Sequence, residues 1–548
     1  MKSSLLASIG LISFYLGYLF YSKYISKTIF REKTNKKTPA HSYNDGVDFV
    51  PTHKNILLGH HFTSIAGAAP IIGPCIALYW GWLPAFIWIV IGIIFMGAVH
   101  DYGALVISAK EKGQTIGRLS SKVLNSRVRI MFLLFVACLT WLVLAVFANA
   151  IAGLFIKNPS SVIPINIEIL IAIIIGILVY KKNWNALIPS ILALIALYFF
   201  IFVGTKSPIS LSDFGVQNEK HVWIVFLFIY SSIASLLPVW VLLQPRDYIN
   251  SHQLFVGLGL IYFSIFVINP NISAPAINIS EHGPSIFPFL FITVACGAIS
   301  GFHGLVSSGT TSKQLNSFSE ARQIGYGSML GEGALGLASL IAAAAGLSLV
   351  AGCSFEGFYG TWEIASSNGA IPFISGSSAM LEKIGFSNIV ASTLISVLVI
   401  SFAATTLDTA TRIQRMIMVE LGSALRIELL KNKYFATLVG VLPAYLLVSN
   451  GMGGKLWPVF GTSNQMLAAL TLMIISIYFW KKGRNVTPLV VPMIFLIFIT
   501  LTALISKTHM FFQNNDYLLL SVNTILIGLI FWMVAEGFLL VRSKSNDK

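Results

Sequence analysis

Apolar runs about 20 residues long follow one another along almost the whole chain of 548 residues, and they limit its possible folds more than any other feature. A helix that crosses the hydrocarbon core of a bilayer needs about 20 mostly apolar residues. Only 10% of the residues are charged, against roughly 25% in soluble domains. This composition excludes a soluble globule and a disordered chain, and it disfavours a nucleic-acid-binding protein. We predict an all-α polytopic membrane protein in a lipid bilayer.

The apolar runs predict about fifteen transmembrane helices. Two of them, 434–449 and 464–480, are shorter than the others. The segment 351–386 is rich in Gly and Ser and is predicted to be a loop or a re-entrant segment. The predicted spans are 3–22, 57–80, 83–108, 130–156, 162–180, 186–204, 222–243, 253–269, 286–306, 325–350, 387–407, 434–449, 464–480, 488–505 and 518–541.

The basic residues predict the orientation of these helices. The chain contains 36 Lys and Arg against 21 Asp and Glu, a net charge of +15, and cytoplasmic loops carry an excess of Lys and Arg. With the N-terminus outside and the C-terminus in the cytoplasm, 29 of the 36 basic residues fall on the cytoplasmic side. No Lys or Arg then lies within a span, and Lys507 lies in an outer loop.

Three polar features are predicted to lie at the membrane surface. The segment 408–434 alternates charged and apolar residues and is predicted to be an amphipathic helix on the cytoplasmic face, as a connector or in a regulatory role. Arg246 and Asp247 follow Pro245 in a predicted cytoplasmic turn, where they form either a local ion pair or a gate. Glu168 and Glu536 lie near span ends and are expected to reach the interface.

A few titratable groups fall inside the predicted spans, where a charge is costly. His60 and His61 open the second span, His100 and Asp101 lie in the third, and His303 and Glu332 follow in the ninth and tenth. Counted from the cytoplasmic ends of their helices, these groups reach a similar depth. Carboxylate–imidazole pairs at one depth fit a proton relay. A static polar network that holds the helices together is the alternative.

Glycine and proline predict breaks in two of the spans. The second span reads GHHFTSIAGAAPIIGPC over 59–75, and the ninth reads GAISGFHGLVSSGTTSK over 297–313. Broken helices at membrane depth are tolerated where they line a cavity or are buried in protein, and their free termini can bind ions and carboxylates. Asn464 and Gln465 follow a Gly at the start of a later span. They are predicted either to form interhelical hydrogen bonds or to bind substrate.

These segments together resemble the carbon starvation protein family, CstA. The similarity covers 59–74, 80–105, 237–250, 300–315 and 324–337, in collinear order from about Tyr43 to about Gln465. The resemblance implies a bacterial inner-membrane transporter for peptides or pyruvate, driven by protons or another coupling ion. It also implies a distant kinship to amino-acid–polyamine–cation transporters, whose cores contain two broken helices.

The resulting hypothesis is a secondary transporter of a small carboxylate-bearing nutrient, with no cofactor, no metal and no nucleic-acid partner. The alternatives are an intramembrane enzyme that uses the His, Asp and Glu residues, or a channel or sensor subunit. We expect four regions: an N-terminal helix and basic loop (1–42), two transmembrane domains (43–322 and 323–480) and C-terminal helices (481–548). The predicted site residues are Asp101, Glu332, His61, His100 and His303 for proton coupling, Gly59, His60, Gly67, Gly301, Thr310, Thr311, Asn464 and Gln465 for substrate, and Arg246 with Asp247 as a gating ion pair.

Overall fold

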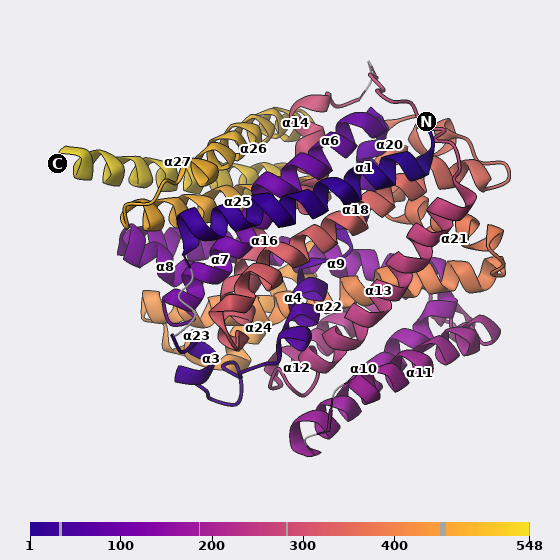
Figure 1. The fold of residues 1–548 in the computed structure, drawn as a ribbon, viewed down its shortest axis with the longest axis horizontal. Helices are drawn as coiled ribbons and strands as arrows, with labels where there is room; N and C mark the ends of the chain where they lie inside the picture. Colours follow the sequence, from indigo (N-terminus) through magenta and orange to yellow (C-terminus); the bar gives the residue numbers. More distant parts are fainter. Residues whose placement is uncertain (32–35, 183, 186, 281–282, 450–455, 547–548) are drawn as a thin grey trace.

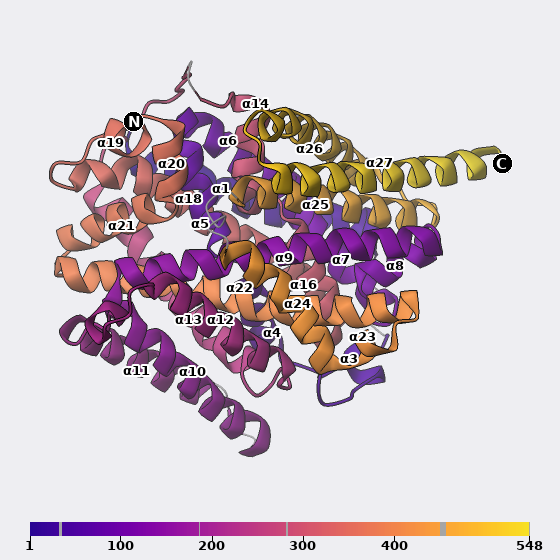
Figure 2. The same ribbon diagram turned by 180° about the vertical axis from the view of Figure 1, so that it is seen from behind.

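The computed structural model describes residues 1–31, 36–182, 184–185, 187–280, 283–449 and 456–546. Within these ranges the chain is almost entirely helical, and the long helices lie side by side in one bundle (Figure 1). The labels of the two termini lie at opposite ends of the bundle in both views (Figures 1 and 2). These ends are called below the N-terminal end and the C-terminal end.

The helices of the described residues have the following bounds. The first half contains α1 (Ser3–Leu16), α2 (Ser22–Ile25), α3 (Pro39–Ser42), α4 (Lys54–Ile65), α5 (Ala69–Ala77), α6 (Trp82–Gly92), α7 (Ala98–Lys110), α8 (Ile116–Val123), α9 (Ser126–Lys157), α10 (Val162–Gly176), α11 (Leu187–Lys206), α12 (Glu219–Leu236) and α13 (Leu243–Ile268). The second half contains α14 (Ile286–Thr293), α15 (Ala295–Ala298), α16 (Gly301–Val306), α17 (Ser312–Gln314), α18 (Ser328–Ala345), α19 (Phe355–Tyr359), α20 (Trp362–Asn368), α21 (Ile371–Lys383), α22 (Asn388–Leu425), α23 (Glu428–Lys431), α24 (Lys433–Leu447), α25 (Trp457–Trp480), α26 (Thr487–Gln513) and α27 (Tyr517–Asn546).

Twelve helices in the described part of the chain are long and apolar enough to cross a membrane, or thirteen when the bent pair α4–α5 is counted as one span. The prediction of about fifteen spans was therefore too high by this criterion. Two predicted spans account for the difference. The run 434–449 corresponds to α24, which is apolar but short, and the run 286–306 is divided into α14, α15 and α16.

The two halves of the bundle pack in a matched way. In the first half α9 packs against α12, and α13 packs along the broken segment α4; in the second half α22 packs against α24, and α25 packs along the broken segment α16. The halves meet where α9 runs along α22 and α12 touches α24. The α10–α11 hairpin lies at the edge of the bundle, against α13 (Figure 2). The two broken helices are thus enclosed by protein, as unwound backbone at membrane depth requires.

The predicted amphipathic surface helix at 408–434 is wrong for most of its length. Helix α22 continues without a break to Leu425, and its charged residues Asp408, Arg412 and Glu420 are buried. The pattern of charged and apolar residues looked amphipathic, but the polar face meets partners inside the bundle. Arg412, for example, donates to Asp48 over 2.7 Å.

The predicted cytoplasmic turn after Pro245 is also wrong, because α13 begins at Leu243. Arg246 and Asp247 lie in its first turns and are fully buried. Lys507 lies within α26 and is buried, with its ammonium group donating to Thr462 Oγ1 over 2.6 Å. The prediction that spans contain no Lys or Arg therefore fails, since Arg246 and Lys507 both belong to helices of spanning length.

The segment 351–386 folds into three short helices, α19, α20 and α21, at the N-terminal end of the bundle (Figure 2). Helix α21 packs against α18 and α22, and most of its side chains are buried. The segment is thus a packed cap on this end of the bundle, in place of a plain loop.

Candidate functional site

The first broken helix unwinds between α4 and α5, at Ala66 to Ala68, and its two halves are bent by 44°. Pro70 in the first turn of α5 has no backbone N–H to donate into the preceding turn, so the helix restarts there. Gly67 lies in the break, where an added Cβ would meet Thr406 Oγ1 at 2.5 Å and the Phe147 ring at 2.9 Å. Gly67 therefore lets α22 and α9 approach the unwound backbone.

The second broken helix unwinds at Ile299 and Ser300, which are extended. Asn464 from α25 supplies the missing helix cap: its Oδ1 accepts from the backbone N–H of Phe302 over 2.9 Å. Its Nδ2 donates to Ser300 Oγ over 2.9 Å and to Cys296 Sγ over 3.0 Å. A side chain from another helix therefore holds the break open, and the predicted broken helix is confirmed.

Four predicted residues meet between the breaks. Asp101 Oδ1 lies 2.7 Å from His100 Nδ1, and Asp101 Oδ2 lies 2.9 Å from His303 Nδ1. The other ring nitrogen of His303, Nε2, lies 3.4 Å from Glu332 Oε2. All four side chains are at most 1% exposed. They form one chain, called the Asp101 cluster, in which His303 bridges two carboxylates.

The arrangement of the Asp101 cluster suits a mobile proton. The cluster contains two carboxylates and two imidazoles, so with both acids ionised a single charged imidazole leaves one negative charge in excess. Such an imbalance away from water is costly, and binding a proton relieves it. Neither Glu332 oxygen has a hydrogen-bond partner within the described residues, which leaves Glu332 free to take the proton.

Two further predicted histidines make contacts outside the Asp101 cluster. His61 Nδ1 lies 2.9 Å from Thr311 Oγ1, in the π-helical turn Ser307–Thr311 that continues α16. This contact joins the two broken helices. His60 faces the other way and bonds to Asp247 Oδ2, which also accepts from Ser64 over 3.2 Å. The adjacent histidines thus reach different partners: His61 contacts a threonine hydroxyl and His60 contacts a buried acid.

Arg246 and Asp247 do not act as one ion pair. Arg246 Nε donates to Glu168 Oε1 over 3.2 Å, and its Nη1 donates to Asp408 Oδ2 and to the Tyr230 hydroxyl. Asp247 pairs with His60 instead. The prediction that Glu168 reaches the interface is wrong, because Glu168 is 1% exposed. Adjacent residues on a helix point in different directions. Arg246 therefore contacts acids on α10 and α22, whereas Asp247 contacts His60 of α4.

The remaining predicted site residues lie in packing positions. An added Cβ on Gly59 would meet Ser251 Oγ at 2.7 Å, and one on Gly301 would meet the backbone of Asn464 at 2.4 Å. Thr310 Oγ1 donates within its own helix to Val306 O. Gln465 Nε2 donates to Phe291 O over 2.6 Å. Their contacts show helix packing, and a role in binding substrate stays a prediction for all of them.

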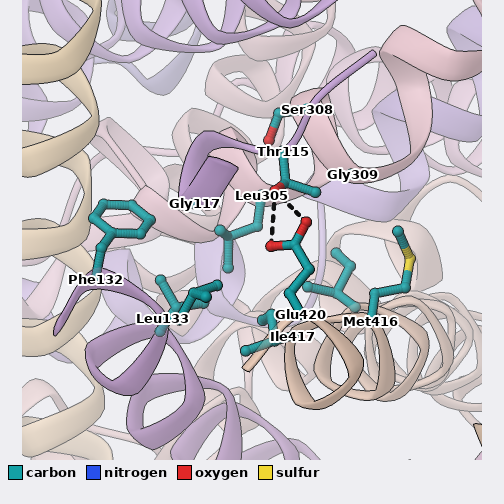
Figure 3. A pocket seen from close by; sticks show the side chains of 12 residues that line it. Thr115, Gly117, Phe132, Leu133, Leu305, Ser308, Gly309, Met416, Ile417 and Glu420 are labelled. Carbon is teal, nitrogen blue, oxygen red and sulfur yellow. Dashed lines mark hydrogen bonds between the residues drawn. The ribbon is translucent and has the colours of Figure 1, made fainter. Parts of the chain in front are cut away.

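A small pocket lies beside the second broken helix, towards the C-terminal end of the bundle. Ser308 and Gly309 line it from one side and Glu420 of α22 from the other (Figure 3). Thr115 Oγ1 donates to both carboxylate oxygens of Glu420, over 2.9 and 3.1 Å. At about 20 Å³ the pocket has room for about one water molecule.

Within the residues that the structure describes, no group of three or more His, Cys, Asp or Glu side chains is arranged to hold a metal ion. The four cysteines are free thiols, and Cys296 donates weakly to Ser300.

The sequence interpretation missed several polar residues that make contacts across helices. Glu168, Asp408 and Gln314 are buried and Tyr230 is half-buried, and Gln314 Nε2 lies 3.3 Å from His60 Nε2. One feature of the sequence could have indicated buried polar residues here. Asp408 and Arg412 are four residues apart on one helix face, at the end of an apolar run.

Comparison with known proteins identifies the family. The family model described as "Carbon starvation protein CstA" matches residues 2–351 and 358–503. The chain is 30% identical to the "Peptide transporter CstA" of Bacillus subtilis (strain 168), over 88% of this chain and 86% of that protein. It is also 30% identical to the "Pyruvate/proton symporter BtsT" of Escherichia coli (strain K12), over 92% of this chain and 81% of that protein.

Among solved structures, that of a manganese transporter mutant from Eremococcus coleocola covers 90% of this chain and 98% of its own, with 15% identity and a TM-score of 0.48. The family match extends over almost all of the helices described above, and the relatives match along most of their own length. The chain belongs to the carbon starvation protein CstA family.

Proposed function

We propose that this protein is a secondary transporter of the bacterial inner membrane that imports a small carboxylate-bearing nutrient, a peptide or pyruvate, together with protons. Relatives in the family are named as a peptide transporter and as a pyruvate/proton symporter. The helices of spanning length support a multi-pass membrane protein. The N-terminus faces outwards and the C-terminus faces the cytoplasm in this proposal, because that orientation places most Lys and Arg on the cytoplasmic side.

The observation that carries the proposal is the Asp101 cluster between two broken helices. His303 belongs to one broken helix, and Asp101 belongs to α7. A proton that neutralises this cluster changes the attraction between the two elements. Alternating access then follows if the broken helices move relative to α7 when the proton binds or leaves. His61 extends this coupling to the other broken helix through Thr311.

Substrate binding is proposed at the two breaks. The unwound segments at Ala66–Ala68 and Ile299–Ser300 leave backbone groups and helix termini without helical partners, and the N-terminus of a helix favours a carboxylate. Gly67, Gly301, Thr310 and Thr311 lie in or beside these segments. Gly59, His60, Asn464 and Gln465 complete the proposed region.

The test is uptake by purified protein in proteoliposomes. Labelled pyruvate and a labelled dipeptide are supplied separately, each with and without an imposed proton gradient. We expect at least one of them to accumulate above its outside concentration only when the gradient is present. Equal uptake with and without the gradient would contradict proton coupling. The absence of uptake for both substrates would contradict the proposed substrate class.

A further inference from the structure

A second buried ionic cluster lies apart from the Asp101 cluster, where four other helices meet. Arg246 of α13 is its centre, with Glu168 of α10, Tyr230 of α12 and Asp408 of α22 around it. The Tyr230 hydroxyl also donates to Asp408 Oδ2 over 2.7 Å, and Ser401 Oγ donates to Glu168 Oε2 over 2.6 Å. We call this group the Arg246 cluster. Its three charged side chains are at most 1% exposed.

The charges of the Arg246 cluster do not balance. One guanidinium faces two carboxylates, so the fully ionised cluster carries one negative charge in excess. A buried charge without a partner costs several kcal/mol. Some positive charge must therefore neutralise the excess, either on one of the two acids or from a neighbouring group.

The neighbouring groups do not supply this charge. Asp247 and His60 form their own pair, which is neutral when the imidazole is charged and adds a further negative charge when it is not. Arg412 lies one turn further along α22, but it is paired with Asp48. The titratable and charged groups that face Asp408 from the helices packed around it are Glu168, Tyr230, Arg246, Asp247 and, through Asp247, His60.

The hydrogen bonds indicate which acid takes the proton. Both Glu168 oxygens accept a hydrogen bond, one from Arg246 and one from Ser401. Asp408 Oδ2 accepts from Arg246 and Tyr230, whereas Asp408 Oδ1 has no hydrogen-bond partner among the described residues. Oδ1 is the carboxylate oxygen of this cluster with room for a proton.

We propose that Asp408 is a second proton-binding site, which is loaded in the state described here and releases its proton during transport. The site rests on the proposed transport function, and it adds one proton per substrate to the proton carried by the Asp101 cluster. Release from Asp408 strengthens its attraction to Arg246, and this change connects the proton to the contacts among α10, α12, α13 and α22. A sodium ion would balance the charge equally well, so the test separates the two cations.

The first experiment detects the proton itself, without any transport. Infrared difference spectra of purified protein at neutral pH compare the wild type with Asp408→Asn, Glu168→Gln and Asp213→Asn; Asp213 is an exposed acid and serves as the control. We expect the C=O stretch of one protonated carboxylic acid to disappear in Asp408→Asn. It should also disappear in Glu168→Gln, because one acid then faces one guanidinium and both ionise. Asp213→Asn should keep the band. Carboxylic-acid bands in Asp408→Asn that are unchanged from those of the wild type would overturn the proposal.

The second experiment counts protons in proteoliposomes with the membrane potential held at zero. We expect Asp408→Asn to move one proton fewer per substrate than the wild type. At a gradient of one pH unit, its accumulation ratio should therefore fall about tenfold, while exchange of substrate for substrate persists. An unchanged ratio would mean that the proton on Asp408 is fixed, and would overturn its role in transport. Accumulation driven by a sodium gradient and lost in Asp408→Asn would also overturn it, in favour of sodium.

The outcomes of the two experiments also separate this proposal from the proposed function. Wild-type protein that does not respond to a proton gradient contradicts proton coupling as a whole. Wild-type protein that accumulates substrate with a gradient, alongside an unchanged Asp408→Asn, contradicts only the second site. Size-exclusion profiles of the variants show whether each one is folded before it is assayed.

Discussion

The carboxylate of Asp101 lies 2.9 Å from Nδ1 of His303, although 202 positions separate the two residues in the chain. This contact joins an unbroken stretch of α7 to the second broken helix, and the other nitrogen of His303 faces Glu332. One imidazole therefore connects two buried acids on two further helices.

Replacing His303 with Gln should separate the two acids. The amide cannot carry a proton between Asp101 and Glu332, so we expect the rate of gradient-driven uptake to fall by about 100-fold, the order of magnitude of a lost proton-transfer group. Initial uptake rates in proteoliposomes measure this effect. His41→Gln is the matched control, since His41 is exposed and bonds to Asn316. Equal rates in the two variants would show that His303 is only a packing residue.

Gly301→Ala should destabilise the second break. The new Cβ would lie 2.4 Å from the backbone oxygen of Asn464 and 2.5 Å from the backbone nitrogen of Ala468, and neither backbone atom can move without shifting α25. We expect a loss of about 1–3 kcal/mol in the free energy of unfolding, seen as a lower melting temperature in detergent. Gly153→Ala is the control, because nothing lies within 4 Å of that position in α9. A melting temperature for Gly301→Ala at or above that of the wild type would refute the close approach.

Asn464→Ala should remove the cap of α16. The backbone N–H of Phe302 then loses its acceptor, which costs about 1–2 kcal/mol. Asn523→Ala is the control, because it makes the same chemical change at another site. Asn523 is also buried and donates to Leu504 O, but it lies in α27, away from the second break in the chain. Both variants should melt at lower temperature than the wild type, and only Asn464→Ala should also lose transport. Equal transport in the two variants would leave Asn464 with a purely structural role.

Glu111 provides a pH-dependent contact at the C-terminal end of the bundle, just beyond α7. Burial favours a higher pKa for its carboxyl, but hydrogen bonds from Lys122 and Tyr478 outweigh burial and lower the pKa below its ordinary value. A lowered pKa means that the ionised form stabilises the fold. This contribution is complete above the ordinary pKa of a glutamate, about 4.3, and is lost as the pH falls through the lowered value.

Glu111→Gln should therefore lower the melting temperature at pH 7, by an amount that corresponds to about 1 kcal/mol or less for this partly exposed group. The difference from the wild type should shrink as the pH falls below about 4, because the wild-type carboxyl is then protonated as well. Melting curves across this pH range measure the effect. A difference that grows towards acid pH would contradict the lowered pKa.

Four of the five residues predicted for proton coupling, all except His61, lie together in the Asp101 cluster. Apolar run lengths placed Asp101, His303 and Glu332 at a similar depth, and a charge at that depth needs a partner, so the three had a reason to meet. The two breaks were also predictable, because Gly and Pro are concentrated in both segments and disfavour a continuous helix. These features depend on local sequence and on bilayer thickness.

The Arg246 cluster could not be predicted in the same way. Its pairs join residues 78 and 162 positions apart, on helices whose mutual arrangement no local pattern encodes. Glu168 near a span end and Asp408 beside an apolar run both looked like surface residues, since a charge near the interface normally reaches water. The packing of α10 and α22 against α13 buries them instead. The number of spans was too high because the apolar run 286–306 has the length of one span but is divided into α14, α15 and α16, and because α24 is shorter than a span.

The measurement that tests the central claim most directly is substrate accumulation by Asp101→Asn in proteoliposomes with an imposed proton gradient. The variant should reach the membrane and exchange substrate for substrate, but its internal substrate should rise only to the external concentration, because the Asp101 cluster can no longer bind and release the coupling proton. Accumulation by Asp101→Asn above the external concentration would contradict the assignment of proton coupling to this cluster.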